Sequence, residues 1–148
     1  WANKAHEGFL GNSVIGKWCN LGAGSNASNL KNTYGNVRQW SYASQTLEDT
    51  GLQFCGLLMG DHSKCGIGST FNTGTIIGPA SVIFDSGFPP KHIPPFSWFN
   101  AKTGTMRLHD FEKMTGTAEK VMSRRKVSMS DGAFANLSAL FARRSAES

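Results

Sequence analysis

Histidine is the side chain with the widest chemical use in this sequence, because a neutral imidazole can bind a metal ion or accept a proton near neutral pH. The four histidines are His6, His62, His92 and His109. The separations of His6, His62 and His92 do not align three imidazoles on one edge of a repeating fold, and no carboxylate–histidine pattern accompanies them. We therefore expect no metal site. His62 and His109 are expected at the surface.

The three cysteines, Cys19, Cys55 and Cys65, have no CxxC spacing and indicate neither a disulfide framework nor a zinc site. Their number and burial-prone positions favour a reducing cytoplasm. No stretch approaches the roughly 18 uninterrupted apolar residues of a membrane span, so we expect a soluble protein without membrane contact. The first residue is Trp1, and no signal-like segment follows it. We interpret the chain as a fragment or a processed product.

The net charge of +5 could suggest a nucleic-acid partner. Much of it lies after residue 112, in Arg124-Arg125-Lys126 and Arg143-Arg144. Such clusters are typical of solvated helix faces, and no nucleic-acid partner is expected. The remaining basic residues suit phosphorylated small molecules equally well, since these need only a few lysines or arginines.

A repeat of six residues provides the main evidence on the fold. From Phe9 the blocks read FLGNSV, IGKWCN, LGAGSN and ASNLKN, and after a break at residues 33–52 they resume as QFCGLL, MGDHSK, CGIGST, FNTGTI, IGPASV and IFDSGF. An apolar residue begins most blocks, and a small residue follows four positions later. Neither helical spacing nor alternation over a long strand fits this pattern. A β-sandwich also fits poorly, because its turns would come about every 8 to 12 residues rather than every six.

A hexad fits one short strand and one corner, with its first residue inside. Three hexads would complete one triangular turn, so residues eighteen apart should stack, such as Phe9 on Ala27 and Met59 on Ile77. The sequence thus predicts an all-β fold, a left-handed parallel β-helix of hexapeptide repeats with a long inserted loop and C-terminal α-helices.

We divide the chain into a β-helix at residues 1–98 and a helical extension at residues 99–148. The loop at residues 33–52 carries Tyr34, Trp40 and Tyr42 and is interpreted as an arm over a neighbouring surface. The four prolines of FPPKHIPPFSWF should end the strands. Helical spacing then begins near Arg107, and a second helix is expected after Ser130.

Residues around His6, NKAHEGFLGNSVIGKWCNLGAGSNASN, resemble the acetyltransferase half of the bifunctional enzymes that make UDP-N-acetylglucosamine, the glucosamine-1-phosphate N-acetyltransferase/uridylyltransferases. These belong to the hexapeptide-repeat acyltransferase superfamily. Trp1 to Trp98 is more closely similar to the carboxy-terminal part of the divergent sugar nucleotidyltransferases of Bacteroidetes-type bacteria. The segments NSVIG, CNLGAG, SNLKN, LQFCGLLMGDHSKCGI, FNTGT and SGFPP carry this likeness.

The resemblance implies acetyl transfer from acetyl-CoA to the amine of an amino-sugar 1-phosphate. His6 matches the family's general base, with Phe9 three positions later, and Asn20 and Asn29 match its substrate-binding asparagines. The phosphates of coenzyme A are expected near lysines such as Lys64 or Lys91. A homotrimer with sites between subunits is also implied.

Two departures from the family pattern leave an alternative open. The family has tyrosine where Phe9 stands, and its Asn-Tyr-Asp-Gly segment is here Asn29-Leu30-Lys31-Asn32. In the alternative, the β-helix is a non-catalytic oligomerisation or regulatory part of a sugar-1-phosphate nucleotidyltransferase. Asn20 and Asn29 would then be corner residues, and His6 an exposed turn residue.

Overall fold

The structure is a computed structural model that describes all 148 residues. Its first hundred residues form strands of mostly two residues, separated by turns. These strands are β1 (Val14–Ile15), β2 (Asn20–Leu21), β3 (Asn26–Ala27), β6 (Leu58–Met59), β7 (Lys64–Cys65), β8 (Thr70–Phe71), β9 (Ile76–Ile77), β10 (Val82–Phe84), β11 (His92–Ile93) and β12 (Ser97–Asn100). In nearly all of them the second residue is buried and the first faces outward, as the hexad pattern predicts.

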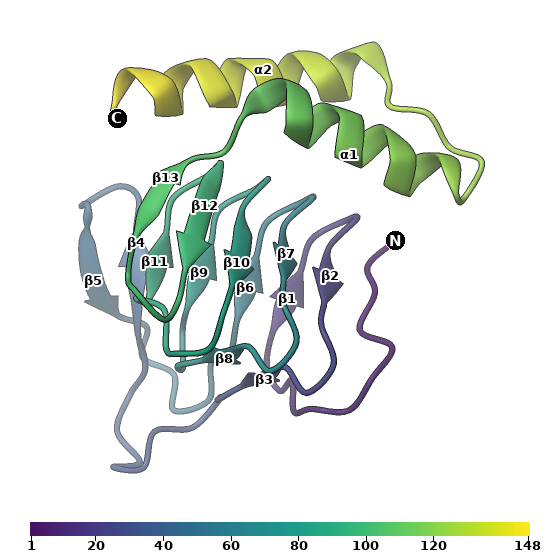
Figure 1. The fold of residues 1–148 in the computed structure, drawn as a ribbon. Helices are drawn as coiled ribbons and strands as arrows, with labels where there is room; N and C mark the ends of the chain where they lie inside the picture. The colour runs from purple at the N-terminus through teal and green to yellow at the C-terminus, as the bar shows by residue number, and fades with distance from the viewer.

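The strands pair side by side in parallel (Figure 1). One sheet has the order β1-β6-β9-β11, a second has the order β13-β12-β10-β7-β2, and β3 pairs only with β8. The second sheet ends in an antiparallel strand, β13 (Met106–Leu108), which pairs with β12. A separate antiparallel hairpin consists of β4 (Arg38–Ser41) and β5 (Thr46–Asp49).

The register tests the predicted stacking residue by residue. Met59 pairs with Ile77, which confirms the spacing of eighteen in the second run of hexads. Ala27 pairs with Leu10 rather than with Phe9, so that prediction is wrong by one residue. The Phe9 N–H donates to Asn26 Oδ1 (2.7 Å), and the Phe9 side chain remains 54% exposed. The corner before it contains Gly8 at a φ of +119°, where a side chain would collide with the Ser25 carbonyl.

The prediction of an all-β, left-handed parallel β-helix is wrong. The structure has mixed α and β content, with short, mostly parallel strands in several small sheets, two α-helices and no closed helix of strands. The third face shows why closure fails: it has strands only at β3 and β8, and residues 85–91 form none. Pro89 and Pro90 lie in that stretch and have no N–H to donate to a ladder.

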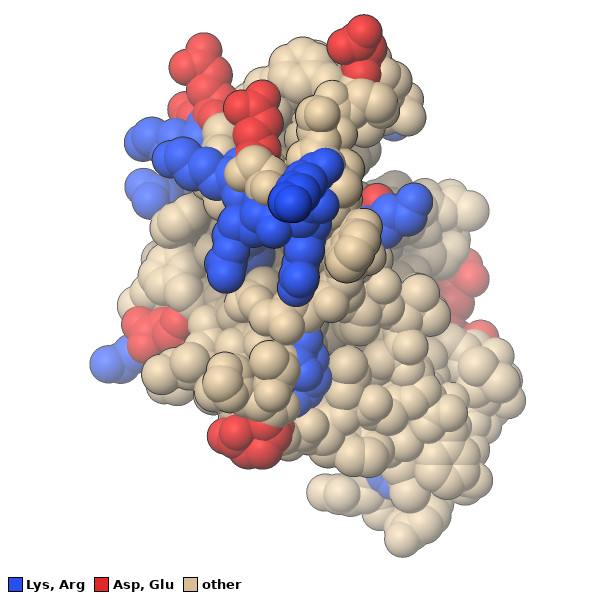
Figure 2. Space-filling view, turned by 90° about the vertical axis from the view of Figure 1, so that its right-hand side faces the viewer, with Lys and Arg blue, Asp and Glu red and all other residues tan.

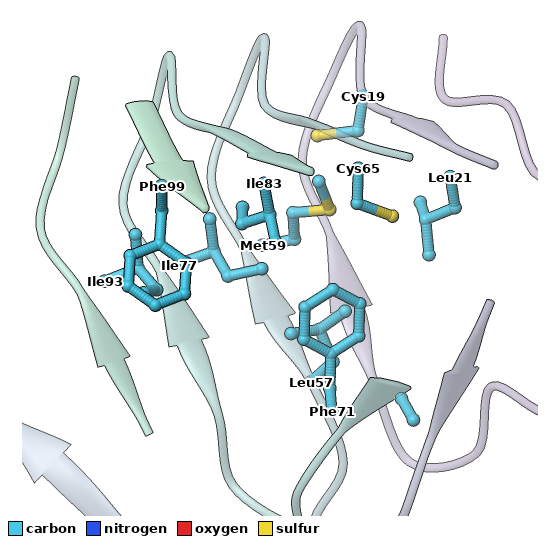
Figure 3. Packing of buried hydrophobic residues seen from close by; sticks show 11 residues of the cluster. Cys19, Leu21, Leu57, Met59, Cys65, Phe71, Ile77, Ile83, Ile93 and Phe99 are labelled. Carbon is cyan, nitrogen blue, oxygen red and sulfur yellow. The ribbon is translucent and has the colours of Figure 1, made fainter. Parts of the chain in front are cut away.

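The main hydrophobic core lies between the sheets (Figure 3). It consists of the inward residues of successive strands, including Leu21, Met59, Cys65, Phe71 and Ile77. These side chains stack along the direction in which the strands repeat, so each strand covers its neighbour's interior. Cys19 and Cys65 are buried within this cluster, as predicted for small core residues.

The two helices are α1 (Phe111–Ser123) and α2 (Asp131–Ala146), close to the positions that the apolar spacing predicts. Ser130 caps α2 by accepting the Ala133 N–H at 3.2 Å, also as predicted. The pair lies across one end of the strand region (Figure 1). Neither helix has the combination of length and hydrophobicity that crossing a membrane requires.

A second hydrophobic core joins these helices to the strands. Its buried members are Ala80, Phe96, Met114, Ala118 and Leu137. Phe96 comes from the proline-rich segment that was predicted to end the strands. Strands β11 and β12 nevertheless continue the two larger sheets on either side of it, and β12 spans the predicted boundary at residue 98.

The predicted arm at residues 33–52 contains the β4–β5 hairpin, which lies against its own chain. The Trp40 ring stacks on the His92 ring with centroids 4.4 Å apart and an interplanar angle of 6°. Lys91 Nζ donates to the Arg38 carbonyl at 3.0 Å. The hairpin is therefore anchored to β11 and the residue before it.

Candidate functional site

His6 lies on an exposed corner near the N-terminus. Its imidazole makes no hydrogen bond, and only its carbonyl accepts one, from Lys4 Nζ at 3.0 Å. The chain after His6 is fixed by two backbone bonds, because Gly24 N–H donates to the Glu7 carbonyl (3.2 Å) and Ala27 N–H to the Phe9 carbonyl (2.8 Å). The imidazole thus has no hydrogen-bond partner, on a corner whose backbone is held in place.

Two of the predicted substrate residues lie together. A side chain at Gly11 would collide with both the Phe9 ring and the Asn29 amide, so the glycine lets these groups meet. Asn29 Nδ2 also donates to Asn12 Oδ1 at 2.8 Å. The side-chain oxygen of Asn29, Oδ1, remains available to a sugar hydroxyl or amine.

Asn20 lies on a different sheet from this pair. It is the outward residue of β2 and is aligned with Lys64 of β7. Its Oδ1 accepts from Asn3 Nδ2 at 2.9 Å. No hydrogen bond joins His6 to Asn20 or to Asn29, and none of the three residues lines the groove or the smaller cavities described below.

The two lysines predicted to contact coenzyme A are also on separate sheets. Lys64 is half-buried on β7, and its Nζ donates to the His62 carbonyl at 2.9 Å. Lys91 precedes β11, beside the hairpin. Burial lowers the pKa of both ammonium groups below the usual range.

One groove of the molecule was not predicted. It lies between α1 and the edge formed by β12 and β13, and it has a volume of about 750 Å³. Trp98, Arg107, His109, Lys113, Gly116, Thr117 and Lys120 are among its lining residues. A smaller cavity of about 220 Å³ shares Trp98, His109 and Thr117 with it and adds His62 and Lys64.

Both histidines in these cavities are buried, so the prediction that they are surface residues is wrong. His109 Nδ1 is 2.9 Å from the Ala80 carbonyl, and its ring meets Trp98 edge-on. His62 is 8% exposed, and its Nδ1 has no hydrogen-bond partner. Burial, and secondly Lys64, lower the pKa of His62, so its ring is neutral at neutral pH. Helix α1 covers these side chains, an effect that hexad positions alone do not reveal.

Lysine and arginine side chains gather in the upper half of the face that Figure 2 shows, around the helices, whereas its lower half carries few charges. Arg125, in the turn between the helices, lies over the Trp1 ring at 5.5 Å from its centroid, and Trp1 stacks on Trp18. Part of the C-terminal charge thus packs against the N-terminal end of the chain.

The side chains that could bind metal or act as nucleophiles are dispersed. No three His, Cys, Asp or Glu residues converge in a way that could hold a metal ion. Burial raises the pKa of the Cys19 thiol to about 11, so this cysteine is protonated and unreactive near neutral pH. The predicted base His6 and the unpredicted groove both offer polar side chains that make no hydrogen bond within the chain.

The chain matches no protein-family model, and no curated protein sequence matches it.

Proposed function

We propose that the chain transfers an acetyl group from acetyl-CoA to the amine of an amino-sugar 1-phosphate of the glucosamine-1-phosphate type. The observation that carries this proposal is the free, exposed imidazole of His6 on a corner whose backbone is bonded to residues 24–27. This segment leads directly to the Phe9–Asn29 pair beside Gly11. His6 is three residues from Phe9, and the Phe9 ring and the polar Asn29 amide lie together beside Gly11.

The chemistry needs one base. The amine nitrogen attacks the thioester carbonyl and forms the amide bond, the carbon–sulfur bond breaks, and coenzyme A leaves as its thiolate. His6 accepts the proton that the nitrogen loses and returns a proton to the thiolate. Asn29 orients the sugar through its side-chain oxygen, and Asn20 contributes from β2.

A homotrimer is part of this proposal, because no hydrogen bond within one chain links His6, Asn20 and Asn29. Phe9 and Val14 are large apolar side chains with more than half of their surface exposed, and Val14 begins an outward row with Leu58 and Ile76. Association through such surfaces would place residues of two chains around one amino sugar. We also propose a cytoplasmic location, which the three free cysteines support.

The test is thiol release from acetyl-CoA in the presence of glucosamine-1-phosphate and related amino sugars. His6→Ala should lower kcat by about 10²–10⁴, the usual contribution of a general base. Glu119→Gln, an exposed change on α1, serves as the control and should leave the rate unchanged. A His6→Ala rate within about twofold of the wild-type rate would exclude His6 as the base.

A second candidate function rests on the same exposed corner. The Asn20 and Asn29 amides already bind Asn3 and Asn12, as expected of structural corner residues. We infer that, if folded chains transfer no acetyl group to any amino sugar, this region serves as a non-catalytic oligomerisation or regulatory part of a sugar-1-phosphate nucleotidyltransferase. Trimers that persist without turnover, measured by light scattering, would support this function.

A further inference from the structure

Trp98 is the common wall of three cavities on the outer face of the β12–β10–β7 sheet. Its aromatic neighbours do not stack on it in parallel: Phe84 is tilted by 53° and His109 by 61°. The group above its ring is the Arg107 guanidinium, 5.5 Å from the centroid. Trp98 is thus a large aromatic side chain with a cation over its ring.

Helix α1 supplies the opposite wall. Lys113, Thr117 and Lys120 recur at helical spacing along the side that faces the groove. A rise of about 1.5 Å per residue separates the two lysines by about 10 Å, a span longer than one phosphate group. The side-chain nitrogens of Arg107, Lys113 and Lys120 take part in none of the hydrogen bonds within the chain. The groove contains two carboxylates, those of Asp110 and Glu112. The Asp110 carboxylate already caps α1 by accepting the Lys113 N–H at 2.8 Å.

Gly116 keeps this wall open. A Cβ at Gly116 would meet no atom within 4 Å, so the glycine is not required by packing. Glycine in the middle of a helix is unfavourable, and its presence here leaves room beside Lys113 and Thr117. A larger side chain at this position would project into the groove without displacing protein atoms.

The smaller cavity beside the groove is lined by a residue that has a buried hydrogen-bonding atom with no protein partner. His62 is more than nine-tenths buried, lines the cavity that it shares with Trp98 and Lys64, and has an unpaired Nδ1. Buried polar groups in proteins are nearly always hydrogen-bonded, so the Nδ1 of His62 lacks the partner that such a group usually has. An imidazole can donate to a ring carbonyl or accept from a ring amino group, depending on its tautomer.

We propose that this groove binds a nucleoside phosphate, with the base against the Trp98 side chain, next to the smaller cavity that His62 lines, and the phosphates on Arg107, Lys113 and Lys120. An aromatic platform with flanking cations recognises both parts of a nucleotide, since bases stack on aromatic rings and phosphates pair with Arg and Lys. The site is separate from the His6 corner and does not depend on acetyl transfer.

The test is isothermal titration of the intact chain with ADP, with adenosine and with inorganic pyrophosphate. ADP should bind at least about tenfold more tightly than either of the other two, because only ADP uses both the platform and the cations. Trp98→Leu should weaken ADP binding about fivefold to 150-fold, the usual range for loss of one stacking side chain.

Gly116→Leu should abolish ADP binding by filling the groove, while it raises intrinsic helix propensity. Gly132→Leu is the matched control, because Gly132 is also a helical glycine with no atom within 4 Å of a built Cβ, and it lies in α2 outside the groove. If Gly116→Leu does not fold, the double change of Lys113 and Lys120 to Gln should weaken ADP binding at least about tenfold. No binding at millimolar ADP, equal affinity for pyrophosphate, or unchanged ADP affinity in Gly116→Leu would each overturn the proposal.

Discussion

The small residues inside the hexads form a hydrogen-bonded column. Ser63, Ser81 and Ser97 are fully buried. The Ser81 N–H donates to Ser63 Oγ at 3.1 Å, and the Ser97 N–H donates to Ser81 Oγ at 3.2 Å. Each hydroxyl therefore satisfies a backbone donor of the next level, a role beyond filling a narrow interior.

We predict that Ser81→Ala lowers the free energy of unfolding by about 1–3 kcal/mol, because the Ser97 N–H loses its acceptor in a place that excludes water. Urea denaturation measures the change. Ser28→Ala, at an exposed serine, is the control and should cost less than about 0.5 kcal/mol. Equal losses for both variants would show that the column contributes nothing beyond its size.

The same residues show how far the sequence could predict local detail. The repeat predicts that Ser63 and Ser81 are small and internal, because size and polarity recur visibly at their positions. The repeat does not predict that the Ser63 hydroxyl accepts the Ser81 N–H, since that bond depends on the register of the strands. The burial of His62 and His109 was unpredictable for a similar reason: α1, distant in sequence from His62, covers both.

At the scale of elements, the β4–β5 hairpin is the feature that the sequence concealed. Its turn contains Gln45 at a φ of +58°, where asparagine or glycine would have signalled a hairpin. The aromatic residues of this loop were interpreted as contacts to another surface, yet Trp40 packs on His92 and Tyr42 meets the same ring edge-on. By contrast, α1 and α2 were predictable, because their spacing and the Ser130 cap are local signals.

The packing of Trp40 on His92 leads to a prediction about pH. Burial, and secondly Arg144, lower the pKa of His92 from 6.5, and Lys91 adds positive charge next to it in the chain. The unfolded chain therefore takes up this proton more readily, so the stability that neutral His92 provides is present above pH 6.5 and decreases as pH falls through the lowered folded-state pKa. Tyr42, whose pKa burial raises, stays uncharged in this range.

We expect His92→Gln to lose less stability than the wild type between about pH 7.5 and pH 5 in urea denaturation. At about pH 8, a double-mutant cycle of Trp40→Leu and His92→Leu should give a coupling energy of about 0.5–1.5 kcal/mol. Because His62 also has a lowered pKa, the difference between wild type and variant is the informative quantity. Identical pH profiles would show that His92 does not titrate in this range.

At the scale of the molecule, two hydrophobic cores stabilise the fold. The strand core follows from the hexads, and its inward residues were largely predictable from the sequence. The helix core depends on Phe96, which lies in a segment that the prolines suggested was an exit from the strands. Prolines predict where ladder donors are missing, but they do not show that β11 and β12 resume pairing on either side.

We predict that Phe96→Ala lowers the free energy of unfolding by about 3–5 kcal/mol, as expected for truncating a fully buried phenylalanine. The Phe96 ring lies 5.1 Å from the Phe141 ring and 6.0 Å from the Phe111 ring, so the change removes contacts to both helices. Phe88→Ala is the matched control, since Phe88 belongs to the same proline-rich segment and is 65% exposed.

Hydrogen exchange of the Phe96→Ala variant should show faster opening of α1 and α2 than of β6 and β9, because helices of 13 and 16 residues are marginal without tertiary packing. Uniform acceleration across helices and strands would mean instead that the two cores unfold as one unit.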